Sequence, residues 1–273
     1  MVRSLWTAAT GMNAQQTNVD TIANNLANVN TVGYKAQVAE FKSLLYQTLQ
    51  TTTTTANGDP KPTSSQVGLG VRTSSINSIV TQGPMLASNS DTSFGIEGDG
   101  YFAIQGADGN TYYTRNGDFT WATNGPGRGM ILTNQDGLPV LSSTGRTITL
   151  DATYVTNKVT VTADGTVCYP DANNVPQSLG MTIGMYQFNN RGGLVRTGDT
   201  MWAVSAASGE ALNEATNRNL IPSKIRQGYL EGSNVQVADE MVNLIVAQRA
   251  YEMNSKAITT TDEMMQTANN LKR

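Results

Sequence analysis

The chain has 273 residues, a net charge of −3 and no histidine. The lack of histidine excludes Ser-His-Asp and Cys-His catalysis and histidine-based metal sites, and we expect neither a cofactor nor a bound metal. The slightly acidic balance gives no basic surface for a nucleic acid, which we do not expect as a partner.

The single cysteine, Cys168, lies among valines, which favours a small core residue over a reactive thiol. No stretch reaches the roughly eighteen apolar residues that a membrane-spanning helix needs. The N-terminus carries Arg3 but lacks the apolar run and cleavage site of a secretory signal. We therefore expect no membrane insertion, and either a cytoplasmic protein or one exported with its N-terminus intact.

The first predicted element is a helix from about Ser4 to Val29 with a heptad seam. Between Leu5 and Tyr34 the only charged residue is Asp20. A helix with one face in water normally carries charges there, so we expect other protein copies to cover its back. The seam positions are Leu5, Met12, Val19 and Leu26, alternating with Ala8, Gln15, Ile22 and Val29.

Small and amide residues replace the charges that usually flank such a seam. They are Ala9, Gly11, Gln16, Asn18, Ala23 and Asn25. Such residues permit close approach and hydrogen bonding on several sides, so we favour assembly over an isolated antiparallel helix pair. Asn24, Asn25 and Asn28 are poor helix formers, and we interpret them as hydrogen-bonding residues between subunits. Gly33 is expected to end the helix as a left-handed cap or hinge.

The next segment, 34–67, changes in character. It runs from Tyr34 and Lys35 through Leu44-Leu45-Tyr46 to five threonines, Thr51–Thr55, and then Asn57-Gly58 with Pro60 and Pro62. Threonine runs favour extended chain, and Asn-Gly with prolines marks a turn. A flexible linker and an extended arm or hairpin against neighbouring subunits are both compatible with this pattern.

From about Gly68 to Gln227 short alternating runs recur between Asp-Gly and Asn-Gly dipeptides, which predicts an all-β body of hairpins. The predicted strands are Ser93–Glu97, Tyr101–Gln105, Thr111–Arg115, Met130–Thr133, Arg146–Leu150, Lys158–Thr162 and Met181–Phe188. The turn dipeptides are Asp99-Gly100, Asp108-Gly109, Asn116-Gly117, Asn124-Gly125, Asp136-Gly137 and Asp164-Gly165.

A second helix is predicted to begin at about Ser233, which stands with Gln236 at the spacing of a capping box. The stretch Met241–Ala247 is apolar nearly all round, so this helix too should be enclosed. Its predicted seam has Val237, Leu244, Tyr251, Ile258 and Met265 at d, and Met241, Gln248, Ser255 and Asp262 at a.

This order of elements predicts an α+β protein in which a discontinuous α-helical coiled-coil domain from both termini carries an inserted all-β body and an extended arm. The predicted domains are 1–34 plus 233–273 (helical), 35–67 plus 222–232 (connecting arm or linker) and 68–221 (β-rich outer body). One helix pair buries too little to offset the ordering of roughly sixty residues, at about 1–2 kcal/mol each. We therefore expect the seams to be poorly ordered until neighbouring copies pack on them.

The candidate chemistry is weak. The turn Glu97-Gly98-Asp99-Gly100 lacks the further ligands of a calcium loop, and no glycine-rich sequence completes a nucleotide site. The other carboxylates are mostly turn residues beside glycine. We expect no enzyme. A hydrolase with paired carboxylates and an extracellular β adhesin are the alternatives from other classes.

Several motifs carry a resemblance to a known family. The segment Ala23–Lys35 (ANNLANVNTVGYK) resembles the N-terminal signature of bacterial flagellar rod and hook proteins, and Glu240–Glu263 resembles their C-terminal signature. The runs Ser90-Asp91, Ile96–Phe102 and Tyr113–Phe119 are similar to motifs of their β domain. The match covers nearly the whole chain.

Within the family, Arg3–Trp6, Leu44–Gln47 and the compact length are most similar to the subunits of the distal rod. Subunits of the proximal rod are the alternative, and the hook protein, which generally carries a larger outer β portion, is less similar. The segment from Tyr46 to about Gln66 is similar to one that is associated with a straight, rigid rod.

The resemblance implies polymerisation into a drive shaft that transmits torque to the hook, with the terminal helices around an inner export channel. It implies contacts with other rod proteins, the hook protein and the rings around the rod. It also implies export by the flagellar type III apparatus without signal cleavage, and a location in the basal body within the cell envelope.

Overall fold

The computed structural model describes residues 2–50, 65–125, 129–171, 173, 175–198, 200–217 and 219–271. The described residues form an α+β protein with helices near both ends and a β-rich part between them. They fall into two compact units. Unit one consists of residues 1–27, 37–78 and 236–273, and unit two of residues 28–36 and 79–235.

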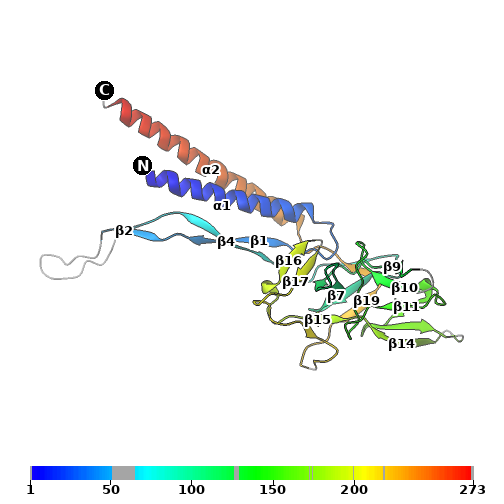
Figure 1. The fold of residues 1–273 in the computed structure, drawn as a ribbon. Coiled ribbons are helices and arrows are strands. Elements are labelled where there is room, and N and C mark those ends of the chain that lie inside the picture. The colour runs from blue at the N-terminus through cyan, green and yellow to red at the C-terminus, as the bar shows by residue number, and fades with distance from the viewer. Residues whose placement is uncertain are drawn as a thin grey trace. The chain divides into compact units, whose positions relative to one another are not determined.

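Unit one combines the helices with an antiparallel ribbon. Its elements are α1 (Val2–Ala27), β1 (Gln37–Ser43), β2 (Tyr46–Gln50), β3 (Ser65–Gly68), β4 (Val71–Ser78) and α2 (Val237–Asn270). The helices lie side by side and run in opposite directions, with the ribbon beside them (Figure 1). None of the described helices is long and apolar enough to cross a membrane.

The ribbon is continuous between its two pairs of strands. β1 pairs with β4, with a register shift between Glu40 and Phe41, and β2 pairs with β3. The two ladders are joined by bonds from Leu44 N to the Gly70 carbonyl and from Leu69 N to the Leu45 carbonyl. The predicted turn residues Thr51–Thr55, Asn57, Gly58, Pro60 and Pro62 lie outside the described residues, so the arm that they were expected to form stays a prediction.

Residues alternate between two faces of β1, as the period of a half-buried strand requires. Gln37, Ala39 and Phe41 are at least half-buried, whereas Val38 and Glu40 are exposed. The ribbon contacts α1, where Thr10 Oγ1 accepts a bond of 3.4 Å from Val71 N. Thus α1 is covered within its own chain on two sides, by α2 and by the ribbon.

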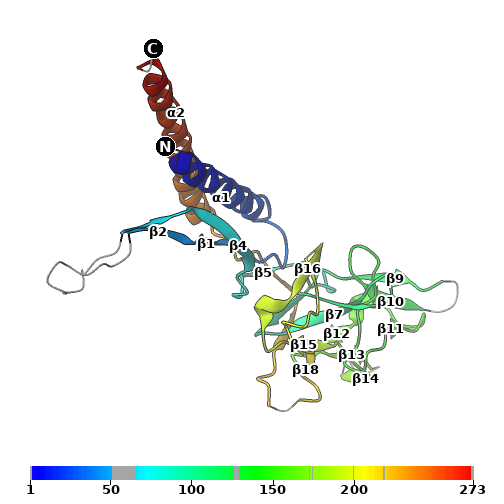
Figure 2. The same ribbon diagram turned by 60° about the vertical axis from the view of Figure 1, so that its left-hand side comes forward.

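Unit two is built from short antiparallel strands (Figure 2). The largest sheet has the order β16-β17-β8-β7-β15-β18, and smaller sheets have the orders β11-β10-β9, β12-β13-β14, β19-β6 and β20-β5. The bounds are β5 (Met85–Ala87), β6 (Phe94–Glu97), β7 (Tyr101–Gln105), β8 (Thr111–Thr114), β9 (Thr120–Thr123), β10 (Met130–Thr133), β11 (Thr149–Leu150), η1 (Thr156–Lys158), β12 (Thr160–Val161), β13 (Thr166–Pro170), β14 (Pro176–Thr182), β15 (Met185–Gln187), η2 (Arg191–Gly193), β16 (Val195–Gly198), β17 (Met201–Ala203), β18 (Leu212–Asn213), β19 (Lys224–Gln227) and β20 (Tyr229–Glu231).

Strand β7 separates two hydrophobic clusters, which explains its unbroken apolar sequence. Phe102 and Ile104 belong to a cluster with residues of β6, β10 and β19, whereas Tyr101 and Ala103 belong to a second cluster around Trp202. Successive side chains of a strand point to opposite faces, so both faces of β7 are covered. The Phe102 ring packs edge-on against Phe119, with 5.1 Å between their centroids.

Most predicted strands are confirmed, and their edges differ. Tyr101–Gln105 and Met130–Thr133 match β7 and β10 throughout. The run Lys158–Thr162 is divided between η1 and the short β12, and Met181–Phe188 spans the end of β14 and all of β15. Strand β9 was missed because its sequence, Thr-Trp-Ala-Thr, is too short for a clear alternation, and β5, β13 and β16–β20 were missed as well.

The turn dipeptides are of two kinds. The glycines of Asp108-Gly109, Asn124-Gly125, Asp136-Gly137 and Asp164-Gly165 have positive φ, as predicted. Gly117 does not, and its requirement is spatial: a Cβ there would lie 1.7 Å from the Phe94 carbonyl oxygen. The same dipeptide signal therefore arises from backbone conformation at some positions and from close packing at others.

The three predicted domains do not correspond directly to the two units. Residues 37–50 and 65–67, which we assigned to a separate arm domain, lie with the helices in unit one, and 222–232 lie in unit two. The contacts define compact units and do not test independent folding, so the three-domain division stays a prediction.

We predict that Phe102→Ala destabilises unit two by about 3–5 kcal/mol, because it leaves a cavity between two packed sheets. Phe102 is fully buried. Chemical denaturation followed by the fluorescence of Trp121 and Trp202 measures the change. The control, Val204→Ala, removes a side chain that is 42% exposed and should cost below about 1 kcal/mol. A similar cost for both variants would contradict this view of the core.

Candidate self-assembly surface

Helices α1 and α2 form a close antiparallel pair. Asn25 Nδ2 donates to Glu240 Oε1 at 3.2 Å, and fourteen residues earlier on α1 Gly11 faces Asn254, fourteen residues later on α2. A Cβ at Gly11 would lie 2.9 Å from Asn254 Nδ2. The small residue therefore permits close approach of the helices, as the sequence suggested for this set of positions.

The seam of α2 agrees with the predicted register at three of the five d positions, and of the predicted a residues only Ser255 is half-buried. Leu244, Ile258 and Met265 are half-buried, but Val237 and Tyr251 at the remaining d positions are 41% and 42% exposed. The predicted a residues Met241 and Gln248 are exposed. The buried or contacting partners lie one residue earlier, at Glu240, Ala247, Asn254 and Thr261.

The physical reason for this difference is the small size of the true seam residues. Positions Ala247 and Thr261 are buried because they face α1 closely, yet they add little to an apolar pattern. The larger apolar residues Met241, Ile245 and Val246 dominate that pattern and lie on other faces. A heptad pattern assigned from the largest apolar residues therefore places exposed residues such as Met241 at the a positions of the predicted seam.

On α1 the predicted seam residues are at least half-buried up to the end of the helix. Ala8 and Ile22 are buried, and the half-buried residues are Leu5, Met12, Gln15, Val19 and Leu26. Two buried residues, Ala14 and Thr21, were not predicted, and Asn25, which was predicted beside the seam, is buried as well. These fit the presence of the ribbon as a second neighbour of α1, which a single heptad seam does not describe.

Asn25 is the polar centre of unit one. Its amide is 1% exposed, donates to the Gln37 carbonyl at 2.8 Å and accepts from Gln37 N at 2.8 Å, in addition to its bond to Glu240. It thus joins α1 to both β1 and α2. Asn25 is thus buried and bonded within its own chain, and its role as a hydrogen-bonding residue between subunits stays a prediction.

The other asparagines differ from Asn25. Asn24 is exposed and donates to Gln37 Oε1 at 3.2 Å. Asn28 lies beyond the end of α1 and accepts from Thr31 Oγ1 at 3.1 Å. Their contacts with other subunits stay a prediction.

The predicted ends of the helices need correction. Helix α1 ends at Ala27, and Val29 packs in unit two beside Tyr34, Ala36 and Val235. Helix α2 begins at Val237 after Gln236, and no side chain caps it. Ser233 is not its N-cap, because Ser233 Oγ accepts from Val235 N in a local turn before the helix. Apolar periodicity continued past the true helix end, and a capping sequence occurred without capping geometry.

Gly33 has the left-handed conformation that we predicted, with φ of +70°. Its N–H donates to the Glu231 carbonyl at 2.8 Å. A Cβ there would lie 2.6 Å from Asn116 N, so packing as well as conformation requires glycine.

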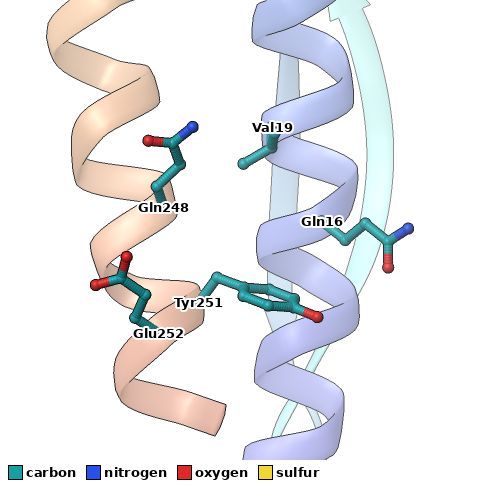
Figure 3. Close-up of a pocket in the computed structure, with 5 residues that line it drawn as sticks. All are labelled: Gln16, Val19, Gln248, Tyr251 and Glu252. Carbon is teal, nitrogen blue, oxygen red and sulfur yellow. The ribbon is translucent and has the colours of Figure 1, made fainter.

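A cleft of about 540 Å³ opens between α1 and α2. It is lined by Gln16, Val19, Gln248, Tyr251 and Glu252. Figure 3 shows the Tyr251 ring reaching toward α1 and Val19 pointing toward α2, while Gln16 and Glu252 turn away from the gap. The lining mixes amides, an aromatic ring and one carboxylate, and it offers no group of catalytic residues.

The outer faces of α2 carry an apolar surface, defined here as Val237, Met241, Val242, Ile245 and Val246. These side chains are between 41% and 62% exposed. No charged residue occurs from Met241 to Gln248. Side chains of this kind seldom gather on the surface of a monomeric protein, and such a patch marks an interaction site.

Both carboxylates of the acidic turn Glu97-Gly98-Asp99-Gly100 form ion pairs with arginines. Glu97 pairs with Arg226 at 2.8 Å and Asp99 with Arg191 at 2.5 Å. Among the described residues no group of three histidine, cysteine or carboxylate side chains is placed to hold a metal ion.

Comparison with known proteins identifies the family. The model of the "Flagella basal body rod protein" matches residues 5–35, that of the "Flagellar hook protein FlgE/F/G D1 domain" matches 95–169, and that of the "Flagellar basal body rod FlgEFG protein C-terminal" matches 226–271. The first match covers most of α1 and the segment after it, the second lies in unit two, and the third covers β20 and α2. The terminal helices and the β unit thus define a structural protein of the bacterial flagellum, and not an enzyme.

Within the structural proteins of the bacterial flagellum, this chain is similar over its full length to basal-body rod proteins. The flagellar basal-body rod protein FlgG of Borreliella burgdorferi is 43% identical over the full length of both chains. The proteins of the same name from Caulobacter vibrioides and Bacillus subtilis are 41% and 36% identical, with at least 99% of each chain covered. The flagellar hook-basal body complex protein FlhP of Bacillus subtilis is 31% identical over the full length of both. The chain belongs to the flagellar basal-body rod protein family.

We predict that Glu240→Gln stabilises the helix pair near pH 7. Partial burial, with a smaller contribution from Asp239, raises the pKa of Glu240, while the Asn25 bond opposes this. Because the fold disfavours the carboxylate, stability is highest below the ordinary pKa of glutamate and falls as the pH rises through the raised value. Glutamine stays neutral and keeps the bond from Asn25.

Circular dichroism at 222 nm between about pH 3.5 and pH 8 measures this effect, which solvent screening limits to about 1 kcal/mol or less. The wild-type helical signal should decline more with rising pH than that of Glu240→Gln. Glu263→Gln, on the exposed side of α2, serves as the control. An equal decline in all three proteins would contradict the prediction.

Proposed function

We propose that this chain is a subunit of the distal rod, which polymerises into a rigid drive shaft that transmits torque to the hook and encloses an export channel. The observation that carries this proposal is the apolar surface of α2. The helix pair leaves Val237, Met241, Val242, Ile245 and Val246 uncovered, and membership of a rod family supports other copies as their cover.

The energetics also favour assembly. Each fully buried Val, Ile or Met contributes about 1.5–3 kcal/mol, so five partly exposed residues leave several kcal/mol unrealised in a single chain. The seam itself is rich in small residues, Ala8, Gly11, Ala14 and Ala247, which bury little apolar area. We therefore propose that neighbouring copies complete the stability of the helices.

The distal position is supported by the names of the full-length relatives, which are rod proteins called FlgG. In Bacillus subtilis the identity is 36% to FlgG and 31% to FlhP. The segments Arg3–Trp6 and Leu44–Gln47, which are similar to distal rod subunits, support the same assignment. Proximal rod subunits are the alternative.

The proposed partners are further copies of this chain, other rod proteins, the hook protein and rings around the rod. The proposed self-assembly surface includes Leu5, Met12, Val19 and the apolar surface of α2. We also propose that the chain reaches the basal body in the cell envelope through the flagellar type III apparatus without cleavage of a signal.

We predict that Val246→Glu blocks assembly and leaves the chain folded, because it puts a charge into the proposed interface at a position that is 62% exposed. The control, Thr259→Glu, places the same charge on the exposed polar part of α2. Electron microscopy of basal bodies and sedimentation of purified protein measure assembly. Rods of normal length built from Val246→Glu would refute the surface.

We further predict that removal of residues 253–273 leaves unit two folded and prevents polymerisation. Unit two ends at Val235, so the truncation removes none of its residues. Near-ultraviolet circular dichroism from Trp121 and Trp202 should be unchanged, whereas no polymer should sediment. Normal assembly by the truncated chain would contradict the role of α2.

A further inference from the structure

The chain passes between the two units after Ala27, Ala36, Ser78 and Val235. Residues at the last three crossings are hydrogen-bonded to one another within unit two. Ile79 N donates to the Ala36 carbonyl at 2.8 Å, and Ala36 N donates to Asn234 Oδ1 at 2.7 Å. The segments that lead into the helices and the ribbon are thus tied together where they leave unit two.

One side chain, Asn234, bridges all three segments. Besides accepting from Ala36 N, its amide donates to the Ile79 carbonyl at 2.8 Å and to Thr81 Oγ1 at 2.9 Å. Each bond has a geometry suited to a strong contact. Because the three partners come from two segments and Asn234 belongs to the third, no segment can slide along another without breaking a bond.

The buried carboxylate of Glu231 also joins these three segments. Glu231 accepts from Lys35 Nζ at 2.6 Å, from Gly83 N at 2.9 Å and from Arg115 Nη1 at 2.9 Å. Lys35 also donates to the Thr81 carbonyl at 2.7 Å. The side chains of Lys35 and Glu231 are fully buried.

This ion cluster is not explained by stability alone. Burial lowers the pKa of Lys35, and the Glu231 carboxylate opposes this shift. Replacing a buried ion group by apolar residues is often neutral or stabilising, so such a group is weak evidence for net stability. What the cluster does supply is fixed geometry, because Lys35 Nζ, Gly83 N and Arg115 Nη1 each donate to a defined oxygen of Glu231.

We propose that Lys35, Arg115, Glu231 and Asn234 form a mechanical clasp, which keeps the connecting segments in register when force passes between the units. This inference rests on the proposed function, since a rod subunit is under torsional load. The bridging amide of Asn234 is predicted to matter little for folding or assembly and to matter under load.

The test replaces the gene in its own bacterium by variants of the full chain. Asn234→Ala removes the bridging amide without leaving a buried charge. The matched control is Asn213→Ala, because Asn213 is also half-buried in unit two and also bonds backbone groups, the Ser143 carbonyl at 2.6 Å and Ala215 N at 2.9 Å. Thr81→Val is a milder variant, since it removes one acceptor of Asn234 at an exposed position.

Electron microscopy of basal bodies, swimming speed at low and high viscosity, and amide hydrogen exchange are measured for each strain. All variants should build rods and swim normally in dilute medium. In viscous medium Asn234→Ala should swim at least twofold more slowly than Asn213→Ala, and its Ile79 amide should exchange at least tenfold faster. Thr81→Val should change in the same direction by less.

The outcomes separate the two proposals. If the wild-type chain builds no rod, the proposed function fails. If wild type builds rods and Asn234→Ala equals Asn213→Ala under load, the clasp is refuted. Should Asn234→Ala lose the near-ultraviolet signal of a folded unit two, Thr81→Val decides: unchanged exchange and unchanged swimming under load would then refute the clasp.

Discussion

The buried carboxylate of Glu231 is the contact on which the arrangement of unit two near its boundary depends. It collects donors from Lys35, Gly83 and Arg115, which are far apart in the sequence. A carboxylate without these donors could not remain in a site with no exposure to water. The position of each segment is therefore a condition for the others, which makes this part of the fold cooperative.

In unit one the seam between the helices has little apolar area, so other contacts must hold the helices together. Small residues bring the helices close, and Asn25 satisfies both backbone groups of Gln37 while reaching Glu240. Hydrogen bonds and close packing thus define the position of the helices, whereas much of the large apolar surface of α2 is left outside. This division separates the contacts that shape one subunit from those proposed to join subunits.

The sequence predicted the fold class, both helices and several of the strands of unit two, because these depend on local periodicity and turn residues. It placed Met241 and Gln248 in the seam, where the structure has Glu240 and Ala247. The reason is that apolar residues of α2 lie both on the face toward α1 and on the exposed apolar surface, and the sequence pattern does not separate the two. Glu231 and Asn234 were missed altogether. No local pattern marks a polar residue whose partners, such as Lys35 at a separation of 196 residues, are distant in the chain.

The near absence of charge on α1 and across the apolar surface of α2 has a consequence for how a polymer of this chain responds to its surroundings. Contacts between uncharged groups are not screened by ions, so their strength should change little with ionic strength. Apolar contacts weaken on cooling, because the hydration of apolar groups becomes less unfavourable. The proposed rod, if held together in this way, would keep its strength across media of different ionic strength, and cold is the condition that would loosen it.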